Sequence, residues 1–202
     1  MTIDDIMRTA PVIPVLVVPE AKTAALIAEA LVAGGLPVIE VTLRTPSSLD
    51  VIAAMAEVDG AIVGAGTVLS SSDLDGAQAA GAHFIVSPGL TDPLALAAQA
   101  SGLPYLPGAV TAGDLMRGLD LGLDHFKFFP AIASGGLAML RALTGPFQRA
   151  RFCPTGGIRP DNASEWLAED AVLCVGGTWL VPEGPVDGAR ITANARAAAS
   201  LR

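Results

Sequence analysis

The stretch VIPVLVVPEAKTAALIAEALVAGG, from Val12 to Gly35, joins a strand pattern to a helix pattern. Its first seven residues form a short apolar run, which is typical of a buried strand. Its second part carries apolar residues that fall on one face of a helix, namely Ala24, Ile27, Ala28, Leu31 and Val32. Gly34 and Gly35 follow where such a helix should stop. The stretch therefore predicts one strand followed by one helix.

The same unit recurs along the chain. Eight apolar runs alternate with alanine-rich helical stretches, and they are VIPVLVV (Val12–Val18), PVIEVTL (Pro37–Leu43), AIVGAG (Ala61–Gly66), HFIVS (His83–Ser87), LPYLPG (Leu103–Gly108), HFKFFP (His125–Pro130), RFCPTGG (Arg151–Gly157) and VLCVGG (Val172–Gly177). Further glycines, Gly81, Gly102 and Gly122, stand where other helices should end.

Eight strand–helix units in tandem predict an α/β protein with a parallel sheet, and eight such units close naturally into a (β/α)8 TIM barrel. An open doubly wound sheet is the alternative. The barrel is favoured because the units are similar in length and no strand breaks the pattern. With 202 residues the chain is short for a fold of typically ~250 residues, so its loops must be short. No linker or shift in composition divides it, and we expect a single domain over residues 1–202.

Composition restricts the partners and the compartment. The formal net charge is −8 and the pI about 4.6, which argues against nucleic-acid binding, where Lys and Arg must neutralise phosphates. The apolar run Val12–Val18 contains Pro14 and is far shorter than the roughly 20 residues of a membrane span. The polar, acidic start MTIDDIMRT does not resemble a secretory signal, and Cys153 and Cys174 lie in apolar runs as buried reduced thiols would. We therefore expect a cytoplasmic protein.

Lys127 is an unusual residue for its surroundings, because it lies inside the aromatic run HFKFFP. One interpretation is a strand lysine whose head group reaches water between helices. The other is a lysine that points into the barrel, since alternation places it on the face opposite to Phe126 and Phe128. Apolar surroundings disfavour the ammonium form and favour a free amine, which can attack a ketone to form a Schiff base.

Glu40 supports the second interpretation. It lies inside VIEVTL, another strand that should be buried, and could act as a general acid and base beside the amine. A structural ion pair with Lys127 or Arg44 is the alternative. Arg44, at the tail of the same strand, offers a forked donor suited to a carboxylate, although a lone arginine there is more often part of a surface ion pair.

The last two strands end in glycine pairs, within PTGG (Pro154–Gly157) and GGTW (Gly176–Trp179). Barrels frequently bind phosphate at these two positions through backbone N–H groups that glycine leaves accessible. Both tails therefore indicate an anionic, phosphorylated ligand. His83 and His125 begin strands, at the end opposite to the expected site, and no carboxylate cluster has the spacing of a metal site.

Six motifs resemble, in order, those of the 2-keto-3-deoxy-6-phosphogluconate (KDPG) aldolase family of the Entner–Doudoroff pathway, often also active on 4-hydroxy-2-oxoglutarate (KHG). They are VIEVTLRT, VGAGTVL, VSPGLT, FKFFPA, RFCPTGGI and VGGTWLVP, and the similarity runs from about Pro11 to Pro182. The resemblance implies a (β/α)8 barrel, a homotrimer, and catalysis of a lyase reaction without metal or organic cofactor.

By match to FKFFPA and EVTLRT, the resemblance implies that Lys127 is the Schiff-base lysine, Glu40 the acid/base and Arg44 a ligand for the substrate carboxylate. The remaining matches concern substrate contacts: Thr67 and Pro88 at the pyruvyl part, Thr155 at a position linked to stereochemical control in favour of the gluconate epimer, and Gly156, Gly157, Gly177 and Thr178 on the phosphate loop.

Three positions depart from the family pattern: Thr178 stands where GGSW has serine, Ile132 where FPAE has glutamate, and the first strand's tail, VLVVPE, has no arginine. Two rival functions remain at this point. One is an epimerase or isomerase of sugar phosphates, which would use carboxylates or a metal and need no strand lysine. The other is a non-catalytic binding or scaffold barrel, in which Lys127 and Glu40 would form a structural ion pair.

Overall fold

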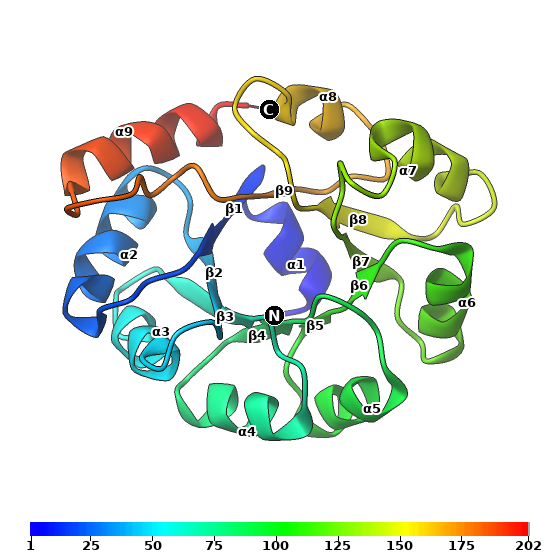
Figure 1. The fold of residues 1–202 in the computed structure, drawn as a ribbon, viewed down its shortest axis with the longest axis horizontal. Coiled ribbons are helices and arrows are strands. Elements are labelled where there is room, and N and C mark those ends of the chain that lie inside the picture. Colours follow the sequence, from blue (N-terminus) through cyan, green and yellow to red (C-terminus); the bar gives the residue numbers. More distant parts are fainter. Residues whose placement is uncertain (202) are drawn as a thin grey trace.

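The computed structural model describes residues 1–201, and it is an α/β barrel with the strands at the centre and helices around them (Figure 1). The strands are β1 (Val12–Leu16), β2 (Val38–Thr42), β3 (Ile62–Gly66), β4 (Phe84–Val86), β5 (Tyr105–Leu106), β6 (Gly108–Ala109), β7 (His125–Phe128), β8 (Arg151–Pro154) and β9 (Val175–Gly177). The segments β5 and β6 are separated only by Pro107, which has no N–H to donate to a ladder, so together they form the fifth of eight strands.

All strand pairs are parallel, in a six-stranded sheet of order β5-β4-β3-β2-β1-β9 and a three-stranded sheet of order β6-β7-β8. The chain through Pro107 joins the two sheets on one side. On the other side, parallel bridges join Phe152 to Val172 and Thr155 to Gly176. The ring is therefore closed. This confirms the (β/α)8 barrel that the eight apolar runs predicted, and the alternative of an open doubly wound sheet is wrong.

The helices that cover the barrel are α2 (Ala24–Ala33), α3 (Ser48–Ala56), α4 (Ser71–Ala79), α5 (Asp92–Ser101), α6 (Ala112–Asp120), α7 (Gly136–Thr144), α8 (Ala163–Leu167) and α9 (Gly188–Ala199), with a 3-10 turn η1 (Ala21–Thr23) before α2. Gly34 and Gly102 are the C-caps of α2 and α5, and Gly102 has the left-handed φ of 75° that glycine accepts readily. These glycines end helices as predicted. None of the helices in residues 1–201 is long and apolar enough to cross a membrane.

Two apolar clusters fill the molecule, one on each side of the strands. The outer cluster lies between strands and helices and includes Phe126 and Phe128, which contact the ring of Phe152. The inner cluster lies within the barrel and comprises Ile6, Met7, Ile13, Val38, Phe84, Val86, Leu106, Cys153, Leu173 and Cys174. Both cysteines are thus buried, as the sequence predicted.

A short helix that the sequence analysis did not predict, α1 (Ile3–Arg8), is drawn in the middle of the ring of strands in Figure 1. Its fully buried Ile6 and Met7 belong to the inner cluster. Asp4 Oδ1 lies 2.9 Å from Nε2 of His125, the first residue of β7. The helix therefore closes the barrel at the end where the strands begin, and His125 has a structural contact there.

Candidate active site

Lys127 points into the barrel from the middle of β7. Its neighbours Phe126 and Phe128 are fully buried in the outer cluster, so alternation turns the lysine inward. The residue is 6% exposed, and its Nζ lies 5.4 Å from the centre of the Phe129 ring. Of the two interpretations of Lys127 that the sequence allowed, the lysine that points into the barrel is confirmed. The strand lysine with its head group in water between helices is wrong.

Glu40 meets this amine from β2. Lys127 Nζ donates to Glu40 Oε1 at 2.8 Å and to Oε2 at 3.1 Å, across 87 residues of sequence. Glu40 is only 3% exposed, so the pair is removed from water on both sides. Loss of either partner would leave an uncompensated buried charge. The direct hydrogen bond also gives a path for a proton between amine and carboxylate, which is the arrangement that imine chemistry requires.

Arg44 and Thr67 lie together at the carboxyl ends of β2 and β3. Arg44 Nε donates to Thr67 Oγ1 at 3.2 Å. Within residues 1–201, no carboxylate lies within ion-pair distance of Arg44, so the expected alternative of a surface ion pair is wrong. Thr67 has a φ of 59°, a left-handed conformation that a β-branched residue rarely adopts. The exposed guanidinium is thus oriented by a strained residue and is available to an anion.

Pro88 follows β4 in a turn that a buried hydrogen-bond chain holds. Ser87 Oγ donates to the carbonyl oxygen of Gly89 at 2.6 Å, and the Tyr105 hydroxyl lies 2.7 Å from the same Oγ. Burial raises the pKa of Tyr105 to about 12, although its hydrogen bond with Ser87 acts in the opposite direction. The phenol is therefore neutral and donates to Ser87. The sequence analysis missed this support, since Ser87 and Tyr105 are 18 residues apart.

The tails of β8 and β9 lie side by side, because Thr155 forms a parallel bridge with Gly176. Thr155 is 5% exposed. Gly156 and Gly157 have φ values of 100° and 83°, and their carbonyl oxygens accept from Ile132 N–H and the Asn162 side chain. In the described part of the chain neither glycine N–H has a hydrogen-bond acceptor, which leaves both as donors for an anion.

Two positions that depart from the family pattern also lie here. A Cβ at Gly157 would lie 2.6 Å from Cγ1 of Ile132, so Ile132 packs directly on the glycine pair. Thr178 follows Gly177 at the end of β9 and is exposed. The structure thus brings both departures to the rim of the site.

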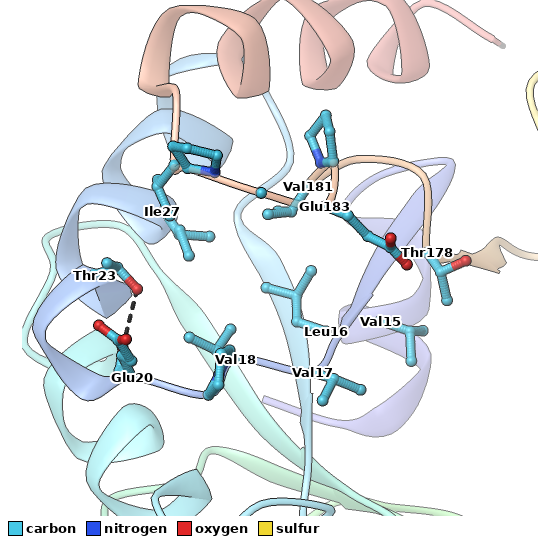
Figure 2. Close-up of a pocket in the computed structure, with 15 residues that line it drawn as sticks. Val15, Leu16, Val17, Val18, Glu20, Thr23, Ile27, Thr178, Val181 and Glu183 are labelled. Carbon is cyan, nitrogen blue, oxygen red and sulfur yellow. Dashed lines mark hydrogen bonds between the residues drawn. The ribbon is translucent and has the colours of Figure 1, made fainter.

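A cavity of about 610 Å³ opens between the segment after β1 and the segment after β9 (Figure 2). It is lined mainly by apolar side chains, with Thr178, Glu20 and Glu183 among the polar ones. Lys127 and Glu40 do not line it, but Val15 does, and Val15 is the register partner of Glu40. The cavity therefore adjoins the Lys127 site at the same end of the barrel. Sequence reasoning missed it, because its walls come from opposite ends of the chain.

No group of three or more His, Cys, Asp or Glu side chains in residues 1–201 is placed to hold a metal ion. The site consists of the buried Lys127–Glu40 pair inside the open end of the barrel, with Arg44 on one side and the N–H groups of Gly156 and Gly157 on the other. This arrangement can form and hydrolyse an imine while it holds an anion at each end of a ligand.

Comparison with known proteins identifies close relatives. The family model described as "Aldolase: KDPG and KHG aldolase" matches residues 3–194. The KHG/KDPG aldolase of Escherichia coli is 52% identical over 199 residues, which is 96% of this chain and 93% of that protein.

Two crystal structures superpose closely. The 2-keto-3-deoxy-6-phosphogluconate aldolase of Zymomonas mobilis, solved with 3-phosphoglycerate, is 56% identical with a TM-score of 0.97, and the alignment covers 99% of this chain and 96% of that one. The KDPG aldolase of Legionella pneumophila, in which pyruvate was captured as a covalent carbinolamine intermediate, is 43% identical with a TM-score of 0.95, and 99% of each chain is covered.

Proposed function

The chain belongs to the KDPG and KHG aldolase family, and from that premise we propose that it is a class I aldolase that cleaves KDPG to pyruvate and glyceraldehyde 3-phosphate through a Schiff base on Lys127. The observation that carries the proposal is the buried contact of 2.8 Å between Lys127 Nζ and Glu40 Oε1. We extend it to KHG as a second substrate, which would give pyruvate and glyoxylate, because the relative from Escherichia coli is a KHG/KDPG aldolase.

The proposed reaction begins when Glu40 takes a proton from Lys127 Nζ and the free amine attacks the keto carbon of the substrate. Glu40 delivers a proton to the hydroxyl that leaves the carbinolamine as water, which gives a protonated imine. Glu40 then takes the proton of the hydroxyl on the fourth carbon. The bond between the third and fourth carbons breaks, its electron pair moves to the iminium as an enamine, and the aldehyde leaves. Protonation of the enamine at the third carbon and hydrolysis release pyruvate and restore the amine.

Arg44, Thr67 and Pro88 would hold the pyruvyl end. A guanidinium binds a carboxylate through two parallel hydrogen bonds, and Arg44 lies at the same barrel mouth as Lys127. The bond from Arg44 Nε to Thr67 Oγ1 would fix its direction. Pro88 would supply an apolar wall next to the reacting carbons, held by the Ser87 and Tyr105 hydroxyls.

The other end of the substrate would lie at the tails of β8 and β9. The N–H groups of Gly156 and Gly157, with Gly177 and Thr178, would bind the phosphate, as glycine-rich backbone does in other barrels. Thr155, at the bridge between the two strands, would contact the hydroxyl at the cleaved carbon and favour the gluconate epimer. The binding of 3-phosphoglycerate to the Zymomonas mobilis relative supports a phosphate-bearing ligand.

We also propose, from its composition and its uniform strand–helix units, that the chain is a single-domain cytoplasmic enzyme. From the family resemblance we propose that it assembles as a homotrimer and needs no metal or organic cofactor. Light scattering of the purified protein tests the trimer, and activity after treatment with a chelator tests the cofactor expectation.

Borohydride trapping with pyruvate tests the proposed function, and the chain offers an internal control, because Lys22 and Lys127 are its only lysines. Lys22 lies on the surface, in an ion pair with Glu20. We expect a reduced pyruvyl adduct on Lys127 in the wild type and in Lys22→Arg, and none in Lys127→Arg. Folded protein that gives no adduct at saturating pyruvate would contradict the Schiff-base mechanism and favour the isomerase or the non-catalytic barrel.

A further inference from the structure

The inner face of β3 carries two glycines. Val63 and Ala65 belong to the outer cluster, so alternation turns Gly64 and Gly66 into the barrel. Register pairing places Gly64 beside Glu40 and Gly66 beside Thr42 on the neighbouring strand β2. The reactive carboxylate of Glu40 therefore faces a part of the barrel wall that has no side chains.

Glu40 occupies the space that a side chain at residue 66 would need. A Cβ built on Gly66 would overlap with Oε1 of Glu40 and would lie 2.7 Å from its Cγ and 2.8 Å from its Cδ. Oε1 is the oxygen that lies 2.8 Å from Lys127 Nζ. A methyl group at this position would therefore displace the oxygen atom that holds the amine.

Neither strand can retreat to relieve such an overlap. The Gly66 carbonyl oxygen accepts from Leu43 N–H at 2.8 Å, and five register pairs join β2 to β3, from Val38↔Ile62 to Thr42↔Gly66. On its other side β2 pairs with β1, where Val15 is the partner of Glu40. Because the backbone is held on both sides, the side chain of Glu40 would have to move.

We infer that Gly66 is a positioning residue for the reaction: its missing side chain lets the Glu40 carboxylate lie against the Lys127 amine. The inference rests on the proposed function, since it assigns Gly66 a role in the proton transfers of Glu40. A larger residue at 66 would separate the carboxylate from the amine without removing either group. The imine would then still form in the end, but each proton transfer that Glu40 performs would be slower.

Gly66→Ala tests this, with kcat, KM, the pH profile of kcat and the final yield of borohydride trapping as readouts. General acid–base assistance typically contributes 10²–10⁴-fold, so we expect kcat to fall by about 10²-fold or more. The final trapping yield with pyruvate should stay near that of the wild type, and the pH profile should lose the same limb that Glu40→Ala loses. A fall confined to KM, or an unchanged pH profile, would overturn the inference.

The double variant Gly66→Ala/Glu40→Ala separates positioning from general damage. Without the glutamate side chain the three atoms nearest to the added methyl group are absent, so the double variant should be no slower than Glu40→Ala. Gly64→Ala is the matched control on the same face of β3, because its Cβ would meet the ring of Phe84 rather than Glu40. We expect the effect of that change to be equally large with and without Glu40.

Each remaining outcome is also decisive. Gly66→Ala could fail to fold while the double variant Gly66→Ala/Glu40→Ala folds. The overlap with Glu40 would then explain why residue 66 must be glycine, and the inference would stand. If neither folds, β3 requires glycine for its own sake and the inference is wrong. If the wild type itself neither traps pyruvate nor cleaves KDPG, the proposed function is wrong. If the wild type is active and Gly66→Ala turns over equally fast, the proposed function stands and only the positioning role of Gly66 is wrong.

Discussion

At the scale of single residues, the chemistry depends on two side chains that share one buried contact. A proton that passes between Lys127 Nζ and Glu40 Oε1 leaves the net charge of the pair unchanged, so the transfer needs no charge to enter from water. The same burial makes the pair sensitive to substitution, because the surrounding barrel cannot solvate a single charge.

Substitution of either partner should separate the two proposed roles. We expect Lys127→Met to abolish turnover, because no other amine reaches the site. Glu40→Gln keeps the shape of the side chain but cannot take a proton, so kcat should fall by about 10²–10⁴-fold with the fold intact. Steady-state kinetics and far-UV circular dichroism measure the two effects. Near-normal turnover by Lys127→Met would contradict the mechanism.

Tyr105 should make the stability of the protein depend on alkaline pH. Its folded-state pKa of about 12 lies above the ordinary value of 10.0, so the folded state keeps the phenol protonated where the unfolded chain has lost its proton. The free energy of unfolding should therefore be unaffected by this group below pH 10 and should fall as the pH rises from 10 through 12, by roughly 3 kcal/mol for two pKa units.

Urea unfolding at a series of pH values, compared between the wild type and Tyr105→Phe, measures this loss. The chain has one tyrosine, so tyrosinate absorbance reports this residue alone. A folded-state titration midpoint near 10 would contradict the expected effect of burial on the pKa of Tyr105.

At the scale of secondary-structure elements, α5 and α6 both begin after a threonine, but only one of the two threonines caps its helix with its side chain. Thr111 caps α6 with its hydroxyl, which accepts from Asp114 N–H at 3.1 Å, while the Asp114 carboxylate accepts from Thr111 N–H at 2.9 Å. Thr91 has the same position before α5, but its side chain makes no capping bond. The third helical residue is Asp114 in α6 but Leu94 in α5, so only the first pattern is that of a capping box.

Thr111→Ala should therefore lower the free energy of unfolding by about 1 kcal/mol, the usual cost of a lost N-cap. Thr91→Ala should change it by less than about 0.5 kcal/mol, as ordinary surface substitutions do. Urea unfolding of the two variants beside the wild type gives the comparison. Equal losses would show that the capping bond of Thr111 contributes nothing of its own.

At the scale of the whole molecule, the barrel was predictable because eight apolar runs of similar length leave few ways to bury them. Alternation along HFKFFP also gave the direction of Lys127. The sequence could not give the distance from Lys127 to Glu40, because that depends on how β2 and β7 face each other across the ring. It also missed α1, whose six residues are too few for a periodic pattern, although the capping box of Thr2 and Asp5 was a readable signal.

The closure of the barrel by α1 should contribute strongly to stability. Met7 is fully buried in the inner cluster, so Met7→Ala should cost about 2–5 kcal/mol of the free energy of unfolding. Met116 is 60% exposed on α6, and Met116→Ala is the matched control, with an expected change below about 0.5 kcal/mol. Urea unfolding measures both. A small effect at Met7 would mean that α1 is not part of the cooperative core.

Because α1 closes one end, the barrel interior is open only at the end where the strands finish. Lys127 is buried in that interior, whereas Thr178 at the rim is exposed. The fragment bound through Lys127 would then be the last to leave, after the phosphate-bearing fragment. Product release would be ordered, so pyruvate should inhibit competitively with respect to KDPG and glyceraldehyde 3-phosphate should inhibit noncompetitively. An accumulation of pyruvate would thereby slow the cleavage of KDPG, and the cause would be the single opening of the barrel rather than a separate regulatory site.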